Sequence, residues 1–401
     1  MVVYVSFLFH IYQPPGQVPS IVRKIANESY RPLIDTIRQS AAAKFTININ
    51  GVLTEQLDDY GLNDVITGFA ELSENDKIEF TNSAKYHAIL PLIPEPEIIR
   101  QIKLNQKTNR RFFGNTYSPA GFFPPELAIG NQIYPSIAST GHEWVIGSGI
   151  ANQESDFPAD HFQTLQDGLV IVYRDDIISN EISFKRLSGE AFIDRIRYRG
   201  RSKDYYVVIA QDGETYGHHM KEAFTTFLHP LLRKLEKTRD VRLTTISELL
   251  DLFPERANGS PRASSWSTTM EDIEHGVAYP LWYHPDNIIH VLQHRIMMRT
   301  LSMVINARNV NLTPEGKKFW EIARTMADRG LHSCQQWWAS KRPWFSPNMV
   351  LNGLDQLRKS AVNSSLAIKS SLSNEDLKES FEDSLEVILD LQRQIISLLM
   401  E

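Results

Sequence analysis

The sequence predicts an α/β fold, in which a βα barrel is followed by a helical domain. Up to about residue 250, short apolar, β-branched or aromatic runs alternate with longer stretches of helical pattern. The short runs are apolar on both faces, as in a parallel sheet that crossover helices cover on its outer side. The pattern then becomes helical, so we expect a barrel over residues 1–255 and a helical domain over 256–401.

Seven runs have the composition of buried strands, which predicts a closed or nearly closed barrel. A further run, Leu243–Ile246, is a candidate eighth strand that the pattern alone does not decide. The seven expected strands are Val2–Phe9, Phe45–Ile49, Ile78–Thr81, Gly121–Phe123, Glu143–Ile146, Leu169–Tyr173 and Tyr205–Ala210.

The segment Glu255–Thr269 is rich in Ser, Pro, Arg and Gly, which is typical of a loop or a domain boundary. Beyond it, Thr313 followed by Pro314 indicates the start of a helix, and the helical pattern continues to about Ser340.

The last segment of the chain has the pattern of one amphipathic helix. Ser373 and Asp376 resemble a capping box in front of the stretch Leu377–Met400. Its apolar stripe includes Phe381 and Leu389 and predicts that the helix docks onto the barrel. Because the polar face is acidic rather than basic, a role at a membrane surface is disfavoured.

Composition and charge exclude several classes of protein. An apolar content of 42% and a charged content of 22% are ordinary for a globular protein. The net charge of -6 provides no basic face for nucleic acid. Cys334 is the single cysteine, which excludes an internal disulfide and suits a reducing compartment. No basic residues precede the short apolar run Val2–Phe9, so we expect a buried strand, no membrane association and a cytoplasmic location. The oligomeric state is not predicted.

Polar side chains follow most of the expected strands. In a βα barrel, catalytic groups lie at the carboxyl ends of the strands, so these residues are the candidates for a site. They are His10 and Gln13, Asn48 to Gly51 with Glu55, Ser83 to His87, Glu126, Arg174 with Asp175, and Gln211 to Glu214.

Two of these groups, Glu126 and Asp212, suit glycoside chemistry. A retaining glycosidase uses one carboxylate as nucleophile and another as general acid/base, about 5–5.5 Å apart. Asp212 directly follows the buried run Tyr206–Ala210, where burial tunes the pKa of a carboxyl group for proton transfer. The alternatives are that Glu126 is an exposed loop carboxylate, that Asp212 belongs to an ordinary turn, and that His10 is a core histidine.

Aromatic and histidine residues supply further candidates. Trp266, Trp337 and Trp338 suit stacking on sugar rings, although packing is the alternative for each. The pair His290 and His294 lies four residues apart without a carboxylate in register, and no His-Glu-x-x-His motif is present. A metal site at this histidine pair is therefore disfavoured. The sequence also contains neither a Gly-rich phosphate loop nor a Gly-x-Ser-x-Gly motif.

Several segments, in order, resemble those of glycoside hydrolase family 57. The segment ending at Glu126 resembles the stretch that ends in the family's nucleophile, and the segment starting at Asp212 resembles the stretch that starts with its general acid/base. The matching segments are His10–Pro14, Asn50–Leu57, Gly121–Glu126, Arg174 with Asp175, and Asp212–Gly217.

The resemblance implies an incomplete (β/α)7 barrel capped by a helical domain, α-glucan or oligosaccharide substrates, and neither metal nor organic cofactor. It implies that His10 and His87 line the sugar pocket, and that the segment Ser333–Trp338 closes the site. Gln13, Glu55 and Arg174 lie in matching segments and are expected to bind substrate. The segment Trp144–Ser148 departs from the family pattern because it lacks an acidic residue, which puts the sugar contacts there in doubt.

The expected activity is hydrolysis or transfer on α-linked glucans through a covalent glycosyl-enzyme intermediate. One alternative is a metal-dependent polysaccharide deacetylase, in which His218 and His219 would need to join an aspartate. The other is a non-catalytic sugar-binding protein on the same scaffold. A degenerate protein of that kind is expected to have lost a carboxylate, and both are present here.

Overall fold

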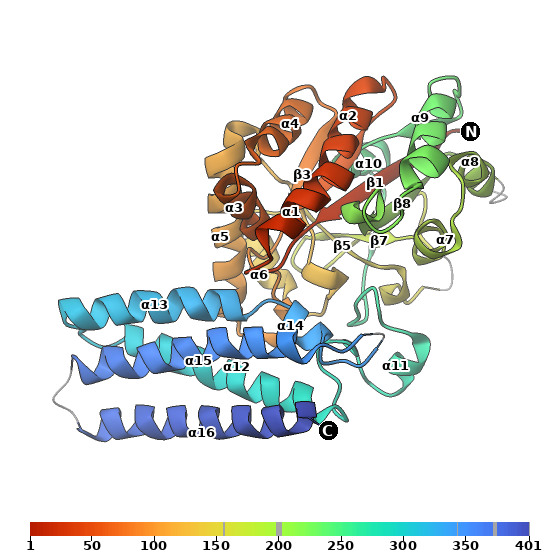
Figure 1. Cartoon of the computed structure of the whole chain (residues 1–401). Helices are drawn as coiled ribbons and strands as arrows, with labels where there is room; N and C mark the ends of the chain where they lie inside the picture. The colour runs from red at the N-terminus through yellow and green to blue at the C-terminus, as the bar shows by residue number, and fades with distance from the viewer. Residues whose placement is uncertain (155–156, 198–202, 343, 372–374, 401) are drawn as a thin grey trace. The chain divides into compact units, whose positions relative to one another are not determined.

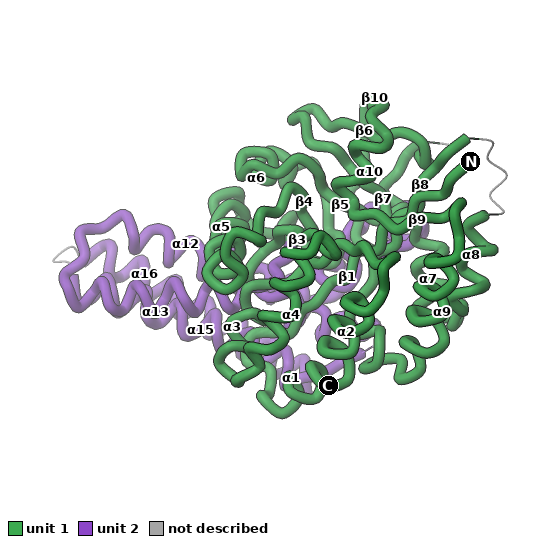
Figure 2. The backbone as a smooth tube through the Cα atoms, turned by 90° about the horizontal axis from the view of Figure 1, so that it is seen from above, with its two compact units in different colours: residues 1–85, 90–266 green, residues 86–89, 267–401 purple. Residues whose placement is uncertain are grey.

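The computed structural model describes residues 1–154, 157–197, 203–342, 344–371 and 375–400. The chain forms two compact units (Figure 2). The first comprises Met1–Lys85 and Leu90–Trp266, and the second comprises Tyr86–Ile89 and Ser267–Glu401. The first unit thus continues to Trp266, past the boundary predicted after residue 255.

Seven parallel strands form the central sheet of the first unit, in the spatial order β8-β1-β2-β3-β4-β5-β7. All seven predicted strands are present, with their ends shifted by one or two residues at most. Their bounds are β1 Val3–Ile11, β2 Phe45–Ile49, β3 Ile78–Asn82, β4 Gly121–Phe122, β5 Trp144–Ser148, β7 Val170–Arg174 and β8 Tyr205–Asp212.

The barrel is incomplete between β7 and β8. Within the described ranges, the ladder of paired strands does not connect these two. Two individual hydrogen bonds bridge them instead: the Asp175 N–H donates to the Val208 carbonyl at 2.7 Å, and Arg174 Nε donates to the Ala210 carbonyl at 2.8 Å. The predicted fold class, an incomplete (β/α)7 barrel followed by helices, is therefore confirmed.

Three short strands were not predicted. β6 (Phe162–Thr164) is antiparallel to β7, β10 (Arg256–Asn258) is parallel to β6, and β9 (Val241–Leu243) is parallel to β1. The prediction of a loop over residues 255–269 was therefore wrong at β10. The candidate strand 243–246 was also wrong beyond Leu243, because Thr245 caps helix α10 with a capping box. Strands of three residues are too short to produce a periodic signal.

Side chains alternate along the strands between the barrel interior and the surrounding helices. On β1, Leu8 packs in the interior cluster, whereas Phe7 and Phe9 pack in the outer one. Helix α10 (Ile246–Leu252) packs against the interior cluster. The outer helices are α1 Pro19–Ile25, α2 Arg31–Gln39, α3 Gly51–Asp59, α4 Asn63–Glu74, α5 Glu95–Phe113, α6 Tyr134–Ser139, α7 Asp176–Lys185, α8 Gly189–Arg197 and α9 His229–Leu235. His10 has the parity of Leu8, so its side chain faces inward at the carboxyl end of β1.

The second unit is helical. Its four long helices lie side by side in Figure 1: α12 Ile288–Arg308, α13 Pro314–Gly330, α15 Pro347–Lys369 and α16 Glu375–Met400. Two short helices, α11 (Met270–Glu274) and α14 (Cys334–Trp337), belong to the same unit. Over the described part of the chain, no helix combines the length and the hydrophobicity needed to cross a membrane.

The predicted helix start at Thr313 is confirmed, because its side chain accepts a hydrogen bond from the Gly316 N–H at 3.1 Å. The helix was expected to reach about Ser340 but ends at Gly330. Three residues later the chain pairs with another segment of its unit: the Ser333 N–H donates to the His87 carbonyl at 3.0 Å. A backbone that pairs in this way leaves the helical path.

Helix α16 buries one face against α12 and α15. Phe381, Ile388, Leu391 and Ile395 are buried, whereas Leu389 is 39% exposed. The predicted stripe was therefore right at Phe381 and wrong at Leu389, and the helix packs on neighbours in its own unit. The predicted capping box at Ser373 lies outside the described residues.

Candidate active site

Glu126 lies in a tight turn directly after β4. Two consecutive prolines, Pro124 and Pro125, lead into it, and Glu126 itself has a left-handed backbone (φ 61°, ψ 19°). Leu127 follows with φ 48°. Left-handed conformations of residues other than glycine cost about 1–3 kcal/mol each, so they persist only where neighbouring structure supports them.

The support for this turn comes from the end of the first unit. Ser264 and Ile129 form an antiparallel bridge with N···O distances of 2.9 and 3.2 Å. The Trp266 N–H donates to the Glu126 carbonyl at 3.1 Å. The Trp266 indole Nε1–H also donates to Glu126 Oε2 at 2.8 Å. Trp266 therefore holds both the backbone and the carboxylate of Glu126.

Asp212 is the last residue of β8 and lies opposite His10 in the parallel ladder with β1. Its pKa is raised from 3.8 to about 6, because burial disfavours the charged carboxylate; Arg174 lowers it in part. A carboxyl group with this pKa exists in both protonation states between about pH 5 and pH 7. It is therefore able both to donate and to accept a proton, as a general acid/base requires.

Arg174 ends β7 and is almost completely buried. Its guanidinium group donates to the Ala210 carbonyl at 2.8 Å, to Asp176 Oδ1 at 2.8 Å and to Asn180 Oδ1 at 3.0 Å. These partners fix the positive charge at the open side of the barrel, near the carboxyl end of β8. From there the positive charge lowers the pKa of the Asp212 carboxyl group.

His10 lies opposite Asp212, near the carboxyl end of β1. Its Nδ1 is 2.7 Å from Asn48 Oδ1, and the Asn48 amide nitrogen donates to Thr81 Oγ1 at 3.0 Å. Because the amide oxygen faces the ring, Nδ1 carries the hydrogen and donates it. Burial lowers the pKa of His10 to about 4, so the ring is neutral at pH 7. Its flat face stacks on Phe123 at 4.5 Å between centroids.

These contacts bring Glu126, Trp266, His10 and Asp212 into one neighbourhood. Glu126 binds the Trp266 indole, whose ring centroid lies 6.2 Å from that of His10. His10 and Asp212 are partners in adjacent parallel strands, so their side chains project on the same face of the sheet. Asp212 thus lies directly beside His10 at the carboxyl end of the barrel, and Glu126 is linked to His10 through the indole of Trp266.

A second buried carboxyl group, Glu214, was among the candidates at the strand ends, but the sequence assigned it no role. Its Oε1 accepts from the Tyr30 hydroxyl at 2.5 Å, from Gln13 Nε2 at 3.3 Å and from the Tyr12 N–H at 3.3 Å. Burial first, and then the charge of Asp212, raise its pKa from 4.5 to about 7. Its place two residues after Asp212 was a usable signal. No sequence signal indicated Tyr30, because it ends a π-helical turn, η1 (Ala26–Tyr30), whose geometry has no sequence pattern.

Glu55, which was expected to bind substrate, pairs with Lys85 at 2.7 Å. The remaining predicted residues belong to the second unit. His87 has a left-handed backbone (φ 58°), and its Nδ1 is 2.8 Å from Ser333 Oγ. Trp337 and Trp338 pack edge to face, with ring centroids 4.7 Å apart.

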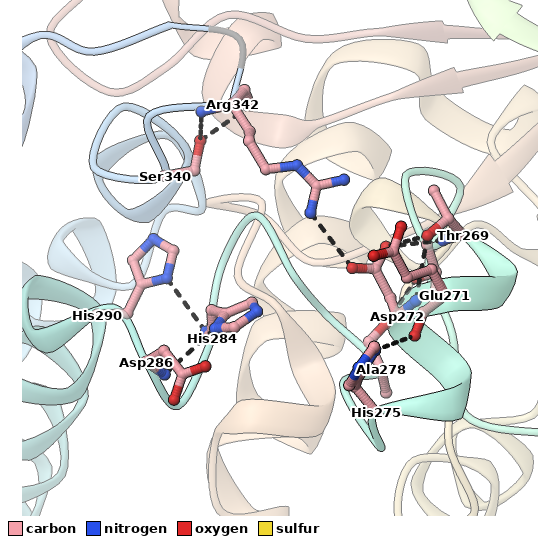
Figure 3. A network of polar contacts seen from close by, with 11 residues as sticks. Thr269, Glu271, Asp272, His275, Ala278, His284, Asp286, His290, Ser340 and Arg342 are labelled. Carbon is pink, nitrogen blue, oxygen red and sulfur yellow. Dashed lines mark hydrogen bonds and ion pairs between the residues drawn. The ribbon is translucent and has the colours of Figure 1, made fainter.

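The described residues contain no group of three or more side chains arranged to hold a metal ion. His218, considered for a deacetylase centre, pairs through Nδ1 with Glu28 Oε2 at 2.7 Å. Figure 3 shows His290 beside His284, whose N–H donates to His290 Nδ1 at 3.2 Å. His290 Nε2 lies 3.0 Å from the Gln336 carbonyl, so both ring nitrogens of His290 have protein partners.

Comparison with known families and structures gives consistent matches. The model of glycosyl hydrolase family 57 matches residues 10–259. An alpha-amylase of Pyrococcus horikoshii is 24% identical over 223 residues, which cover 53% of this chain and 34% of the relative. The chain covers between 21% and 34% of the length of the curated relatives it matches.

Two solved structures show the same fold. A GH57-type branching enzyme from Pyrococcus horikoshii superimposes with a TM-score of 0.74 at 15% identity, covering 97% of this chain and 95% of that one. The 4-alpha-glucanotransferase from Thermococcus litoralis has a TM-score of 0.73 at 17% identity, covering 90% of this chain and 59% of that one.

Proposed function

Because the chain belongs to glycosyl hydrolase family 57, we propose that it hydrolyses or transfers α-linked glucans with retention of configuration. The matched relatives are named alpha-amylases and a 4-alpha-glucanotransferase, and one similar structure is a branching enzyme. These activities share cleavage of an α-glucosidic bond and differ in the acceptor. The substrate class is therefore an α-glucan or an oligosaccharide derived from one.

One observation carries the proposal: Asp212 lies opposite His10 at the carboxyl end of the barrel, and Glu126 bonds the Trp266 indole that packs against His10. In the first step, an oxygen of Glu126 attacks the anomeric carbon and forms a covalent ester. The bond to the leaving sugar oxygen breaks as Asp212 gives that oxygen its proton. In the second step, Asp212 takes a proton from water or from an acceptor hydroxyl, whose oxygen displaces Glu126.

The surroundings of Asp212 suit both of its tasks. Its raised pKa, about 6, keeps a protonated fraction available for the first step. After that step Asp212 is ionised, and the buried Arg174 charge stabilises the carboxylate that must then accept a proton. The neutral ring of His10 adds no positive charge beside Asp212, so burial and Arg174 determine the pKa of this carboxyl group.

A product profile tests this function. The protein is incubated with maltooligosaccharides and with amylopectin. New reducing ends report hydrolysis, longer and shorter oligosaccharides report transfer, and altered chain branching reports branching. Retention predicts that NMR of the first-formed product shows the α-anomer.

The control variants are Glu126→Gln and Asp212→Asn, each of which removes one carboxylate with little change in size. Both are expected to lose activity by a factor of about 1,000 or more, because each group acts in both steps. Full activity in Glu126→Gln would refute the assignment of the nucleophile. Sugar binding without turnover by the unaltered protein would favour a non-catalytic protein.

A further inference from the structure

Trp266 donates a hydrogen bond to the carboxylate of the proposed nucleophile, Glu126, and stacking on a sugar ring does not require such a bond. We propose that Trp266 is a positioning residue: its indole N–H holds the Glu126 carboxylate in the orientation from which it attacks. The inference rests on the proposed function, because it assigns a role within that reaction. It also replaces the expectation that Trp266 acts mainly as a stacking platform.

The first line of evidence is the double attachment of Trp266 to one residue. Its side-chain N–H donates to Glu126 Oε2 at 2.8 Å, and its backbone N–H donates to the Glu126 carbonyl at 3.1 Å. A bond from a neutral donor to a carboxylate is stronger than one between neutral groups. With its backbone and one carboxylate oxygen both held, the Glu126 side chain loses most of its rotational freedom.

The second line of evidence is the backbone of the turn. Glu126 and Leu127 both have left-handed φ angles, 61° and 48°. A turn of this kind returns to ordinary φ angles unless contacts hold it. The antiparallel bridge between Ile129 and Ser264 continues directly into the Trp266 contacts. Residues 264–266 therefore hold the turn formed by Glu126 and Leu127 in place.

The third line of evidence is the orientation of the indole ring. Its plane is turned 70° from the ring of His10 and 71° from that of Phe123, with centroids 6.2 and 6.1 Å away. These edge-to-face contacts fix the plane of the indole, and so they fix the direction in which Nε1–H points. The donor is thus aimed at Glu126 before substrate arrives, which is the preorganised arrangement that supports catalysis.

The role of the N–H changes through the reaction. While Glu126 is a free carboxylate, the N–H orients it. When one carboxylate oxygen bonds to the anomeric carbon, the ester's other oxygen remains a hydrogen-bond acceptor. When water or an acceptor hydroxyl then displaces Glu126, the carbon–oxygen bond breaks and its electron pair returns to the carboxylate. A donor already in place stabilises that returning charge.

The test compares Trp266→Phe and Trp266→Leu, using α-maltotriosyl fluoride as substrate. Fluoride leaves without a proton, so the first step reports on Glu126 and depends little on Asp212. Phenylalanine keeps an aromatic ring and loses the N–H. Positioning predicts that kcat falls about 10- to 100-fold in both variants, with KM within about twofold of its original value. Stacking predicts that phenylalanine preserves activity and that leucine raises KM.

Trp320→Phe is the matched control. The Trp320 indole also donates to an oxygen, the Val304 carbonyl at 3.0 Å, but this bond lies within the helical unit. Its variant is expected to keep the original kcat and KM. If Trp266→Phe behaves like Trp320→Phe, the positioning role is overturned.

A second measurement does not depend on turnover. The indole N–H resonance of Trp266 is identified by its absence from Trp266→Phe. In Glu126→Ala, this resonance is expected to move upfield and its hydrogen to exchange faster with D₂O, because the carboxylate acceptor is gone. An unchanged resonance would overturn the contact itself. Failure of the unaltered protein to process α-maltotriosyl fluoride would count against the proposed function, and the resonance would still decide whether Trp266 holds Glu126.

Discussion

Replacing Glu214 by glutamine is expected to change how stability depends on pH. The pKa of this buried carboxyl group is raised from 4.5 to about 7 in the folded protein. Below about pH 4.5, both the folded and the unfolded chain carry the proton. As pH rises from 4.5 to 7, the unfolded chain loses the proton while the folded chain retains it, so the free energy of unfolding falls over this range.

The size of the effect follows from the two pKa values. A tenfold change in a protonation equilibrium corresponds to about 1.4 kcal/mol, so Glu214 lowers the free energy of unfolding by about 3 kcal/mol between pH 4 and pH 8. Glu214→Gln removes this loss, because an amide does not titrate. Its side-chain oxygen is still able to accept from the Tyr30 hydroxyl. The variant is therefore expected to gain about 3 kcal/mol relative to the original protein as pH rises from 4 to 8.

Urea unfolding at a series of pH values, followed by tryptophan fluorescence, measures this difference. Because the charge of Asp212 contributes to the raised pKa of Glu214, the two carboxyl groups titrate as a pair, and the difference between the curves reports the effect of Glu214 within that pair. Glu74→Gln, at an exposed position on α4, is the matched control and is expected to follow the original curve. The opposite result is a free energy of unfolding of Glu214→Gln that runs parallel to that of the original protein from pH 4 to pH 8. That result would refute the explanation that burial opposes the ionisation of Glu214.

Three further predictions concern other parts of the chain. Arg174→Gln removes the charge that lowers the pKa of Asp212, so the alkaline limb of kcat/KM on maltooligosaccharides is expected to move to higher pH, whereas Arg174→Lys leaves it near its original place. Thr313→Ala removes the N-cap of α13 and is expected to lower the free energy of unfolding of the helical unit by about 1 kcal/mol in urea titration; no change would exclude the cap as a contributor. Gly217→Ala places a Cβ atom 1.9 Å from the Glu28 carbonyl at φ +88°, so we expect a loss of about 3 kcal/mol or more by calorimetry, and an unchanged melting temperature would contradict this packing.

The fold was predictable because its main signals are long and local. Buried strands such as β7 and β8 consist mainly of continuous apolar runs, and their boundaries were predicted to within two residues. The signals that failed depend on contacts distant in sequence. β10 exists because Arg256–Asn258 pair with β6, and α13 ends early because the chain beyond it pairs with residues 87 and 88. Neither pairing leaves a periodic pattern in the sequence.

The candidate site divides in the same way. Strand ends identified His10, Arg174 and Asp212, and the ladders of the sheet place these three residues at one end of the barrel. Trp266 was predicted to bind substrate, and that remains a prediction; composition contained no information about its bond to Glu126. Tyr30 was missed because it belongs to a π-helical turn, whose geometry no sequence pattern indicated.

The two proposed catalytic carboxylates are held by different means, with different consequences. Asp212 is fixed by its register opposite His10 in a buried ladder, so moving it requires moving β8 relative to β1. Glu126 instead lies in a left-handed turn whose shape depends on residues 264–266. Substitutions at residues 264–266 are therefore expected to change the orientation of Glu126 while leaving Asp212 in place. We therefore expect variation at residues 264–266 to change the rate of the proposed attack by Glu126 without shifting the pH dependence proposed for Asp212.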